Sequence, residues 1–229
     1  MKADGAYDGM KNRRTFLKIG AGAAVAGVGL LFNPLFSGVR WAVASVKKII
    51  LPKGTRMDSL INKNPAHLDT RNLGLIPLED FGTMGLSDYH QDVSEWRLNV
   101  EGEVKEPLQL TYKQIRNLPS VERNLLLICP GFFANYGRWK GISMPELLEQ
   151  AGVKPETTHV RFSGPKGSYQ KVEQFPIETV RKNQIFLAYD VNGKPLPLKH
   201  GFPLRLVAEG HYGYDWVKYV DRIEMVKVA

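Results

Sequence analysis

The strongest constraint on the fold is a run of apolar residues that ends at the only cysteine of this 229-residue chain. The run, ERNLLLIC over residues 122–129, has the length and apolar character of a strand buried in a core. Pro130 and Gly131 follow at once and break the strand, because proline has no backbone N–H and glycine favours turns. We therefore expect Cys129 at the open end of a core strand, where α+β domains tend to place reactive groups.

Other segments have the composition of strands, and in residues 96–104 apolar and polar side chains alternate as in a half-buried strand. Residues 158–164, 202–210 and 216–228 are further candidates, and Asn192-Gly193 predicts a tight hairpin turn. No repeat or low-complexity tract interrupts them. The chain is therefore predicted to fold as a mixed α+β domain, mostly sheet, with short helices between the strands.

Two short helices are predicted between these strands. Thr111 and Gln114 have the spacing of a capping box at the start of the first helix, which Pro119 ends. Ser143 and Glu146 have the same spacing at the start of the second helix, which ends near Gly152.

Ahead of this domain, residues 45–91 show no sustained periodicity. We interpret them as an irregular arm that wraps the domain of residues 92–229, because seven residues that interrupt regular structure punctuate them: Pro52, Gly54, Pro65, Gly74, Pro77, Gly82 and Gly85.

The N-terminal residues 1–44 are interpreted as a targeting segment. NRRTFLK over residues 12–18 precedes IGAGAAVAGVGLLF, which is rich in glycine and alanine and resembles a twin-arginine signal. That resemblance implies export of the folded protein to the periplasm by the twin-arginine translocase, with a cleavage site at residues 42–44. An uncleaved membrane anchor is the alternative, because residues 19–36 reach the lower limit of a membrane-spanning length. A basic amphipathic helix is a third interpretation.

The charge is modest once the targeting segment is set aside. The net charge is +8, and the first 44 residues hold six cations and two acidic residues, which leaves +4 for the remainder. This distribution argues against nucleic acid as a partner, although a mildly basic body favours an anionic ligand. Hydrophobic residues make up 43% of the chain, enough for one sizeable core.

The single cysteine limits the chemistry. It excludes an internal disulfide, a protein-held iron–sulfur cluster and a cysteine-rich zinc site. A cysteine on an apolar strand is often only a small buried residue. A thiolate is also a ligand for soft or high-valent metals, and nearby cations such as Arg138 would lower the pKa of the Cys129 thiol. No second metal ligand is evident, so a metal here would have to arrive within an organic cofactor.

Three stretches, in order, are similar to motifs of one known family: residues 96–119, residues 138–153 (RWKGISMPELLEQAGV) after the cysteine and a loop, and residues 199–226 (KHGFPLRLVAEGHYGYDWVKYVDRIEMV). Together they resemble the molybdopterin-binding domain of the sulfite oxidase family, and most nearly the catalytic subunits of bacterial periplasmic methionine sulfoxide reductases. The resemblance implies a mostly β fold of that family, with molybdopterin as cofactor.

The chain departs from the family pattern at three places. Pro130 follows the cysteine, Asp215 stands where a basic residue is frequent, and the loop GFFANYG over residues 131–137 has no arginine. The last difference argues against sulfite as the substrate.

The resemblance also implies roles for individual residues. Cys129 would bind molybdenum directly, and His200 would hydrogen-bond the cofactor. The pterin phosphate needs cations or N–H donors. The motif places four residues at the pterin or its phosphate: Arg205, Trp216, Val217 and Lys218.

Five other positions follow from the resemblance. Ser163 and Gly164 would lie on the dithiolene side of the cofactor. Tyr89 and His90 would lie where the arm meets the cofactor, and Arg138 would position the substrate.

We thus expect an exported molybdopterin-dependent oxidoreductase that transfers an oxygen atom to or from a sulfur-type small-molecule substrate. The resemblance implies a monomer that exchanges electrons with a membrane haem protein or a quinol-linked protein. Two alternatives stay open: a non-catalytic binding or assembly module anchored to a membrane complex, and a thiol-based redox protein that uses Cys129 alone.

Overall fold

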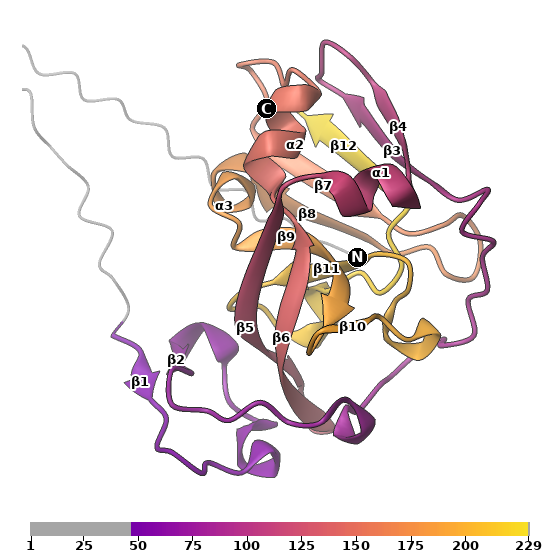
Figure 1. The fold of residues 1–229 in the computed structure, drawn as a ribbon. Helices are drawn as coiled ribbons and strands as arrows, with labels where there is room; N and C mark the ends of the chain where they lie inside the picture. The colour runs from indigo at the N-terminus through magenta and orange to yellow at the C-terminus, as the bar shows by residue number, and fades with distance from the viewer. Residues whose placement is uncertain (1–46, 229) are drawn as a thin grey trace, which may run out of the picture. The chain divides into compact units, whose positions relative to one another are not determined.

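The computed structural model describes residues 47–228, and the predicted targeting segment lies outside them. Two five-stranded sheets form the body (Figure 1). The first has the order β4-β3-β12-β7-β8; the second has the order β10-β9-β6-β5, with β11 also paired to β9. This is the predicted mostly β architecture with short helices. Among the described residues, no helix has the length and apolar character needed to span a membrane.

The first sheet contains β3 (Arg97–Gly102), β4 (Leu108–Thr111), β7 (His159–Ser163), β8 (Val172–Pro176) and β12 (Arg222–Val226). Strand β12 lies at its centre, parallel to β3 and antiparallel to β7. Alternate side chains of these strands, such as Leu98, Phe162 and Ile223, are fully buried in the main core. The predicted strand at residues 216–228 is shorter than expected, because residues 216–221 form an irregular connection with bends before β12.

The second sheet contains β5 (Ser120–Cys129), β6 (Phe133–Ile142), β9 (Ile185–Val191), β10 (Lys194–Pro195) and β11 (Arg205–Ala208). The predicted core strand is confirmed as β5, which forms a long hairpin with β6 and ends at Cys129 opposite Phe133. At Gly141 the chain approaches β9 so closely that a Cβ atom would lie 1.9 Å from the Leu187 carbonyl oxygen. Only glycine fits there.

The two faces of the β5–β6 hairpin bury different surfaces. Leu125, Leu127 and Trp139 point into the main core, whereas Leu126 and Tyr136 pack against the arm. Successive strand residues point to opposite faces, so position parity alone decides which surface a side chain meets.

Three short α-helices connect the strands: α1 (Tyr112–Asn117), α2 (Met144–Gln150) and α3 (Ile177–Arg181). The capping box of α1 is confirmed, with Thr111 and Gln114 bonded reciprocally. The capping box predicted for α2 is wrong. Ser143 bonds to the Glu146 side chain, and the Met144 N–H is instead satisfied by Asn183 Oδ1 at 2.8 Å.

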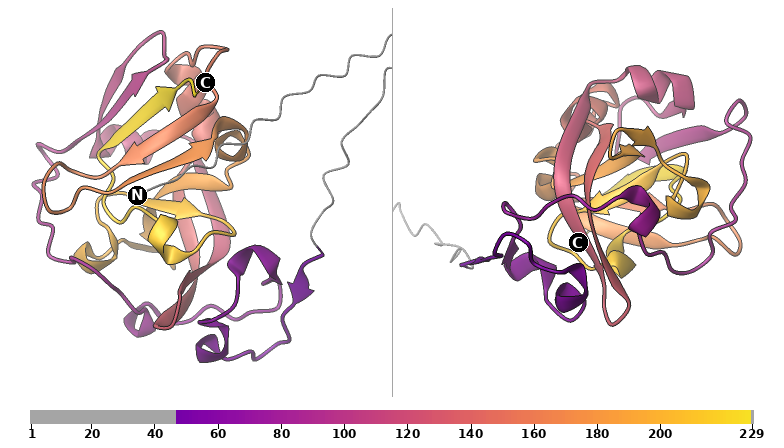
Figure 2. Two further views of the ribbon diagram at one scale, coloured as in Figure 1. Left: turned by 180° about the vertical axis from the view of Figure 1, so that it is seen from behind. Right: turned by 60° about the horizontal axis from the view of Figure 1, so that its bottom comes forward.

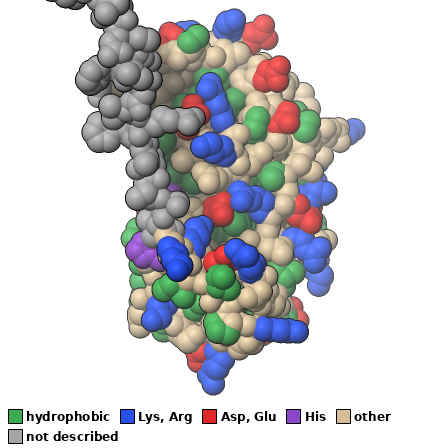
Figure 3. All heavy atoms as spheres, turned by 90° about the vertical axis from the view of Figure 1, so that its left-hand side faces the viewer, with side chains coloured by type: hydrophobic (Ala, Val, Ile, Leu, Met, Phe, Trp, Pro, Cys, Tyr) green, Lys and Arg blue, Asp and Glu red, His purple; other side chains and the backbone are tan. Residues whose placement is uncertain are grey.

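The arm contains three 3₁₀ turns, Met57–Leu60, Pro65–His67 and Leu78–Asp80, and the paired short strands β1 (Ile49–Ile50) and β2 (Leu68–Asp69). It lies along the β5–β6 hairpin (Figure 2) and buries Leu51, Leu60 and Leu68 in a small second core. Two further 3₁₀ turns, Leu198–His200 and Gly213–Asp215, flank β11. On the face of the described residues shown in Figure 3, basic and acidic side chains are interspersed.

Candidate active site

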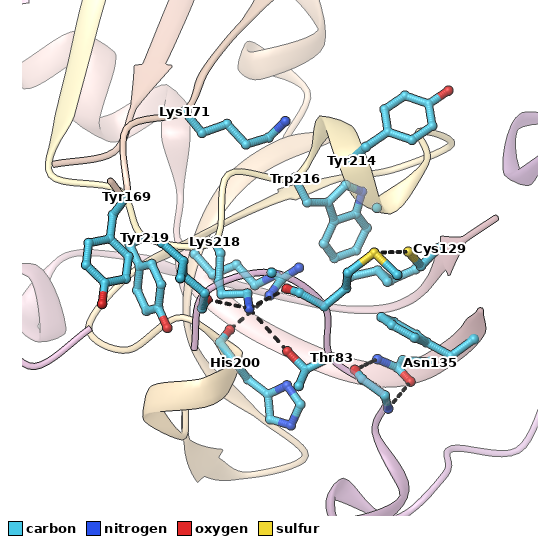
Figure 4. Close-up of a pocket in the computed structure, with 18 of the residues that line it drawn as sticks. Thr83, Cys129, Asn135, Tyr169, Lys171, His200, Tyr214, Trp216, Lys218 and Tyr219 are labelled. Atoms are coloured by element: carbon cyan, nitrogen blue, oxygen red, sulfur yellow. Dashed lines mark hydrogen bonds between the residues drawn. The ribbon is translucent and has the colours of Figure 1, made fainter. Parts of the chain in front are cut away.

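A cavity of about 360 Å³ opens beside the end of β5 (Figure 4). Strands β5 and β6 contribute five residues to its wall: Leu127, Cys129, Phe133, Asn135 and Trp139. The rest comes from three segments distant in sequence: residues 82–86 of the arm, residues 168–171, and residues between His200 and Tyr219. The end of the core strand is therefore the meeting point of the arm and both sheets.

Cys129 lies in this wall with its thiol partly buried. Its Sγ atom is 3.7 Å from Sδ of Met84. Burial raises the pKa of the Cys129 thiol, because the thiolate loses solvation. We expected the opposite from a nearby Arg138, and that expectation is wrong. A thiol with a raised pKa is a poor free nucleophile, which disfavours a thiol-based redox protein.

Arg138 does not line the cavity. It lies on β6, and its guanidinium approaches Glu122 at 3.9 Å with half of the side chain exposed. Phe133, Asn135 and Trp139 of the same strand do line the cavity, and Arg138 has the opposite parity. Its side chain therefore points to the other face of the hairpin, and the geometry gives it no contact with a substrate in the cavity.

Arg205 is a buried cation in the cavity wall. Its guanidinium carbon lies 5.9 Å from the ring centre of Trp139 and 5.8 Å from that of Trp216. One N–H bonds to the His200 carbonyl oxygen at 3.1 Å, whereas Nε has no hydrogen-bond partner among the described residues. Burial lowers the pKa of Arg205 to about 10, so the group stays charged at neutral pH.

His200 and Trp216 also carry buried nitrogens, Nε2 and Nε1, that lack a partner within the described part of the chain. Burial first, and then the charges of Arg205, Lys199 and Lys218, lower the pKa of His200 to about 4. The imidazole is therefore neutral at pH 7. Unpartnered buried polar atoms are rare, and three of them around one cavity indicate a ligand that bonds to them.

Residues 82–86, which we call the strap, form one side of the cavity. Gly82 exchanges two hydrogen bonds with the buried Asn135 side chain, at 2.9 and 2.8 Å.

Lys218 also holds the strap. Its ammonium donates to Thr83 Oγ1 at 3.2 Å and to the carbonyl oxygens of Met84 and Leu86 at 2.7 and 2.9 Å (Figure 4). Burial, and then repulsion from Arg205, lower the pKa of Lys218 to about 8.

The charged side chains that line the cavity are all basic. Arg205, Lys218 and Lys171 line the cavity, and none of its described lining residues is acidic. Lys171 is paired with Glu173 at 2.7 Å, which leaves Arg205 and Lys218 as the cations without a carboxylate partner among the described ion pairs. The cavity therefore suits an anionic ligand.

Three tyrosines meet at one edge of the cavity. Tyr169 and Tyr219 line it, and Tyr89 packs against both, at 5.1 and 4.9 Å between ring centres. The Tyr169 hydroxyl donates to Asp88 at 2.7 Å. Tyr89 thus anchors the chain beyond the strap, whereas His90 is exposed and does not line the cavity.

Ser163, Gly164 and Val217 lie behind the wall, not in it. The Ser163 carbonyl oxygen accepts from Asp221 N–H at 3.1 Å, and the Val217 carbonyl oxygen accepts from Leu206 N–H at 2.9 Å. A Cβ atom on Gly164 would lie 2.8 Å from the carbonyl oxygens of Tyr169 and Tyr219. These three residues position the segments that carry lining residues.

The structure therefore brings together five of the residues named from sequence: Cys129, His200, Arg205, Trp216 and Lys218. Sequence reasoning missed the strap and Asn135. A polar asparagine within the otherwise apolar and aromatic sequence GFFANYG was the one available signal for that contact, and the structure places it on β6 as a buried residue.

These features together fit one kind of ligand. Two buried or partly buried cations and three unpartnered nitrogens suit an anionic, hydrogen-bonding group, and the single thiol offers one soft ligand to a metal that brings its other ligands. Among the described residues, no group of three or more His, Cys, Asp or Glu side chains is placed to hold a metal ion. A metal-bearing organic cofactor fits the cavity.

Comparison with known proteins agrees with this fit. Residues 86–229 match the family described as the oxidoreductase molybdopterin binding domain. Oxidoreductase YuiH of Bacillus subtilis is 30% identical over 140 residues, which are 61% of this chain and 69% of that protein. The protein-methionine-sulfoxide reductase catalytic subunit MsrP of Campylobacter jejuni is 24% identical over 231 residues, covering 95% of this chain and 74% of that protein.

Two further similarities are more partial. Nitrate reductase [NADH] 1 of Oryza sativa is 30% identical over 185 residues, but the chain spans only 19% of its length. The sulfane dehydrogenase SoxCD of Paracoccus pantotrophus has a TM-score of 0.58 at 22% identity, with 89% of this chain and 56% of that chain covered, and shares the fold. The chain therefore belongs to the oxidoreductase molybdopterin-binding domain family, the sulfite oxidase family, and is a molybdopterin-dependent oxidoreductase.

Proposed function

We propose that this protein reduces a sulfoxide to a thioether, with methionine sulfoxide in a polypeptide as the first candidate substrate. The proposal is supported by the similarity to MsrP catalytic subunits and by the composition of the cavity mouth. Met84, Leu86 and Tyr214 line the cavity and are 43%, 50% and 56% exposed. Apolar side chains at the mouth suit a thioether group better than a small oxyanion.

The main support for the proposal is that one cavity has two kinds of surface, with unpartnered polar groups in its depth and apolar side chains at its mouth. Arg205, His200 and Trp216 present unpartnered polar atoms in the depth, and they would hold molybdopterin there. Cys129 would bind the metal through its thiolate. Molybdopterin, when bound, supplies the metal-centred two-electron chemistry. The apolar side chains at the mouth would exclude water and orient the substrate.

We further propose export through the twin-arginine translocase to the periplasm, with residues 1–44 as signal or anchor, residues 45–91 as the arm and residues 92–229 as the cofactor domain. The proposed electron donor is a separate membrane haem or quinol-linked protein. Support comes from the N-terminal sequence and from the similarity to MsrP, a catalytic subunit by name.

The test begins with metal analysis of protein purified from a molybdopterin-competent host. About one molybdenum per chain is expected in the parent, and Cys129→Ser should change the metal spectrum. The loaded parent, supplied with a reduced viologen, should convert a peptide containing methionine sulfoxide faster than it converts nitrate. A loaded protein that reduces nitrate but leaves the peptide unchanged, or that oxidises sulfite instead, would contradict the proposal.

A further inference from the structure

One methionine lies in the cavity itself. Of the methionines in the described part of the chain, Met144 and Met225 are buried in the core and Met57 is half-buried in the arm. Met84 is 43% exposed, lines the cavity, and places Sδ 3.7 Å from Sγ of Cys129. Its thioether therefore has the chemistry of the proposed product and touches the residue proposed to bind the metal.

The backbone holds Met84 in that position. Its carbonyl oxygen accepts a hydrogen bond from Lys218 at 2.7 Å, and two residues earlier Gly82 is fixed to Asn135. Gly85 follows with φ of +72° and open space around it, so the chain turns away directly after the methionine. The strap thus presents one thioether to the cavity from a fixed attachment.

Exposure and position have a chemical consequence. A solvent-accessible thioether is readily oxidised to the sulfoxide, which adds a polar oxygen that accepts hydrogen bonds. Sδ of Met84 lies 3.7 Å from Sγ of Cys129, so the sulfoxide would form on an atom that is already beside the residue proposed to bind the metal. An oxidised Met84 would therefore present its sulfoxide inside the cavity, next to Cys129.

We propose that Met84 is an in-cis substrate: once its side chain is oxidised, the protein reduces the sulfoxide of its own strap. In this step the S–O bond breaks, two electrons come from the redox donor and two protons from solvent, one water leaves, and the thioether is restored. The inference rests on the proposed function, and it adds a repair site within the chain.

The experiment uses the loaded, full-length protein. Mild hydrogen peroxide, afterwards removed with catalase, oxidises the exposed Met84 and the half-buried Met57. Peptide mass spectrometry then follows both sulfoxides after addition of electrochemically reduced viologen. We expect the Met84 sulfoxide to disappear at least about tenfold faster than the Met57 sulfoxide, because attachment replaces a bimolecular encounter. Its rate constant should not change on tenfold dilution of the protein.

Two control proteins accompany the parent. Cys129→Ser should retain the Met84 sulfoxide, and Met57→Leu should behave as the parent does. A Met84 sulfoxide that persists while an added peptide sulfoxide is reduced would overturn this inference and leave the proposed function intact. A rate that falls with dilution, or a Met84 that resists peroxide when Met57 is oxidised, would also overturn it. If neither sulfoxide is reduced by protein that contains molybdenum, the proposed function fails and the inference fails with it.

Discussion

At the scale of the residue, Arg205 has a position that lowers the stability of the fold and favours binding of an anionic ligand. Its charge is buried, and no acidic side chain among the described lining residues compensates it. An uncompensated buried charge destabilises a fold. We predict that Arg205→Met leaves the free energy of unfolding of the cofactor-free protein unchanged or raises it by about 1 kcal/mol. Urea unfolding measures this value, and the molybdenum content of the purified variant should fall.

Urea unfolding and molybdenum content together show whether Arg205 acts in ligand binding or in packing. Met fills much of the volume of the arginine stem that packs beside Trp139 and Trp216. A variant destabilised by several kcal/mol would show that Arg205 is a structural residue and would contradict its role as an anion-binding group in the depth of the cavity.

His200 predicts a pH dependence with a definite sign. Its pKa is lowered to about 4 in the folded protein, whereas an unfolded histidine titrates near about 6.5. Between these values the unfolded chain binds a proton that the folded chain does not, so its contribution to stability is lost as the pH falls through this window. Urea unfolding of the cofactor-free parent should show the loss, and His200→Gln should remove on the order of 1–3 kcal/mol of it between pH 7 and 4. Equal slopes in both proteins would contradict the prediction.

At the scale of the element, the strap depends on one side chain of β6. Asn135 is buried and satisfies both the N–H and the carbonyl oxygen of Gly82. Asn135→Ala leaves both groups unpartnered, so we predict a loss of about 1–3 kcal/mol of stability and faster hydrogen exchange of residues 82–86. Hydrogen–deuterium exchange of the peptide that contains the strap measures the effect.

A matched control is available in the arm. Asn72 donates a single hydrogen bond to the Leu51 carbonyl oxygen at 3.3 Å, away from the cavity. Asn72→Ala should leave the exchange of the strap unchanged. Strap exchange that is equally slow in Asn135→Ala and in the parent would show that Lys218 alone fixes the segment.

The elements also show which features a sequence can predict. The capping box of α1 was predicted correctly because both partners lie within one turn. The cap of α2 was not, because Asn183 supplies it from 39 residues away. Arg138 lies within the family motif, yet the tight turn after Cys129 fixes the register of β6 and turns its side chain away from the cavity. A sequence motif therefore predicts which residues follow one another along the chain, but the register of the strand decides which face of the sheet each side chain points to.

The residues of the candidate site also differ in how far the sequence predicts them. Cys129 was predictable because the strand and its end are local features. The family motif located His200 and Arg205, but their burial and missing partners become visible only when distant segments pack. The strap carries no periodic pattern, and its position depends on a contact across 53 residues of sequence.

At the scale of the whole molecule, the packing of arm, hairpin and sheets creates a cavity whose charge is unbalanced before any cofactor binds. Arg205 and Lys218 come from β11 and from the connection before β12, and the strap, which belongs to the arm, accepts hydrogen bonds from Lys218. No single element contains this anion site, so folding and cofactor binding should be thermodynamically linked.

That linkage gives a last prediction. Replacing chloride with inorganic phosphate at constant ionic strength should stabilise the cofactor-free protein, because an anion bound by the folded state adds RT ln(1 + [L]/Kd), about 1.4 kcal/mol at ten times Kd. Thermal unfolding measures the shift. Arg205→Met should abolish it, whereas Lys171→Met should retain most of it, because Lys171 is already paired with Glu173. A shift of equal size in the parent and in Arg205→Met would place the anion elsewhere on the protein and would contradict the assignment of this cavity to the anionic part of the cofactor.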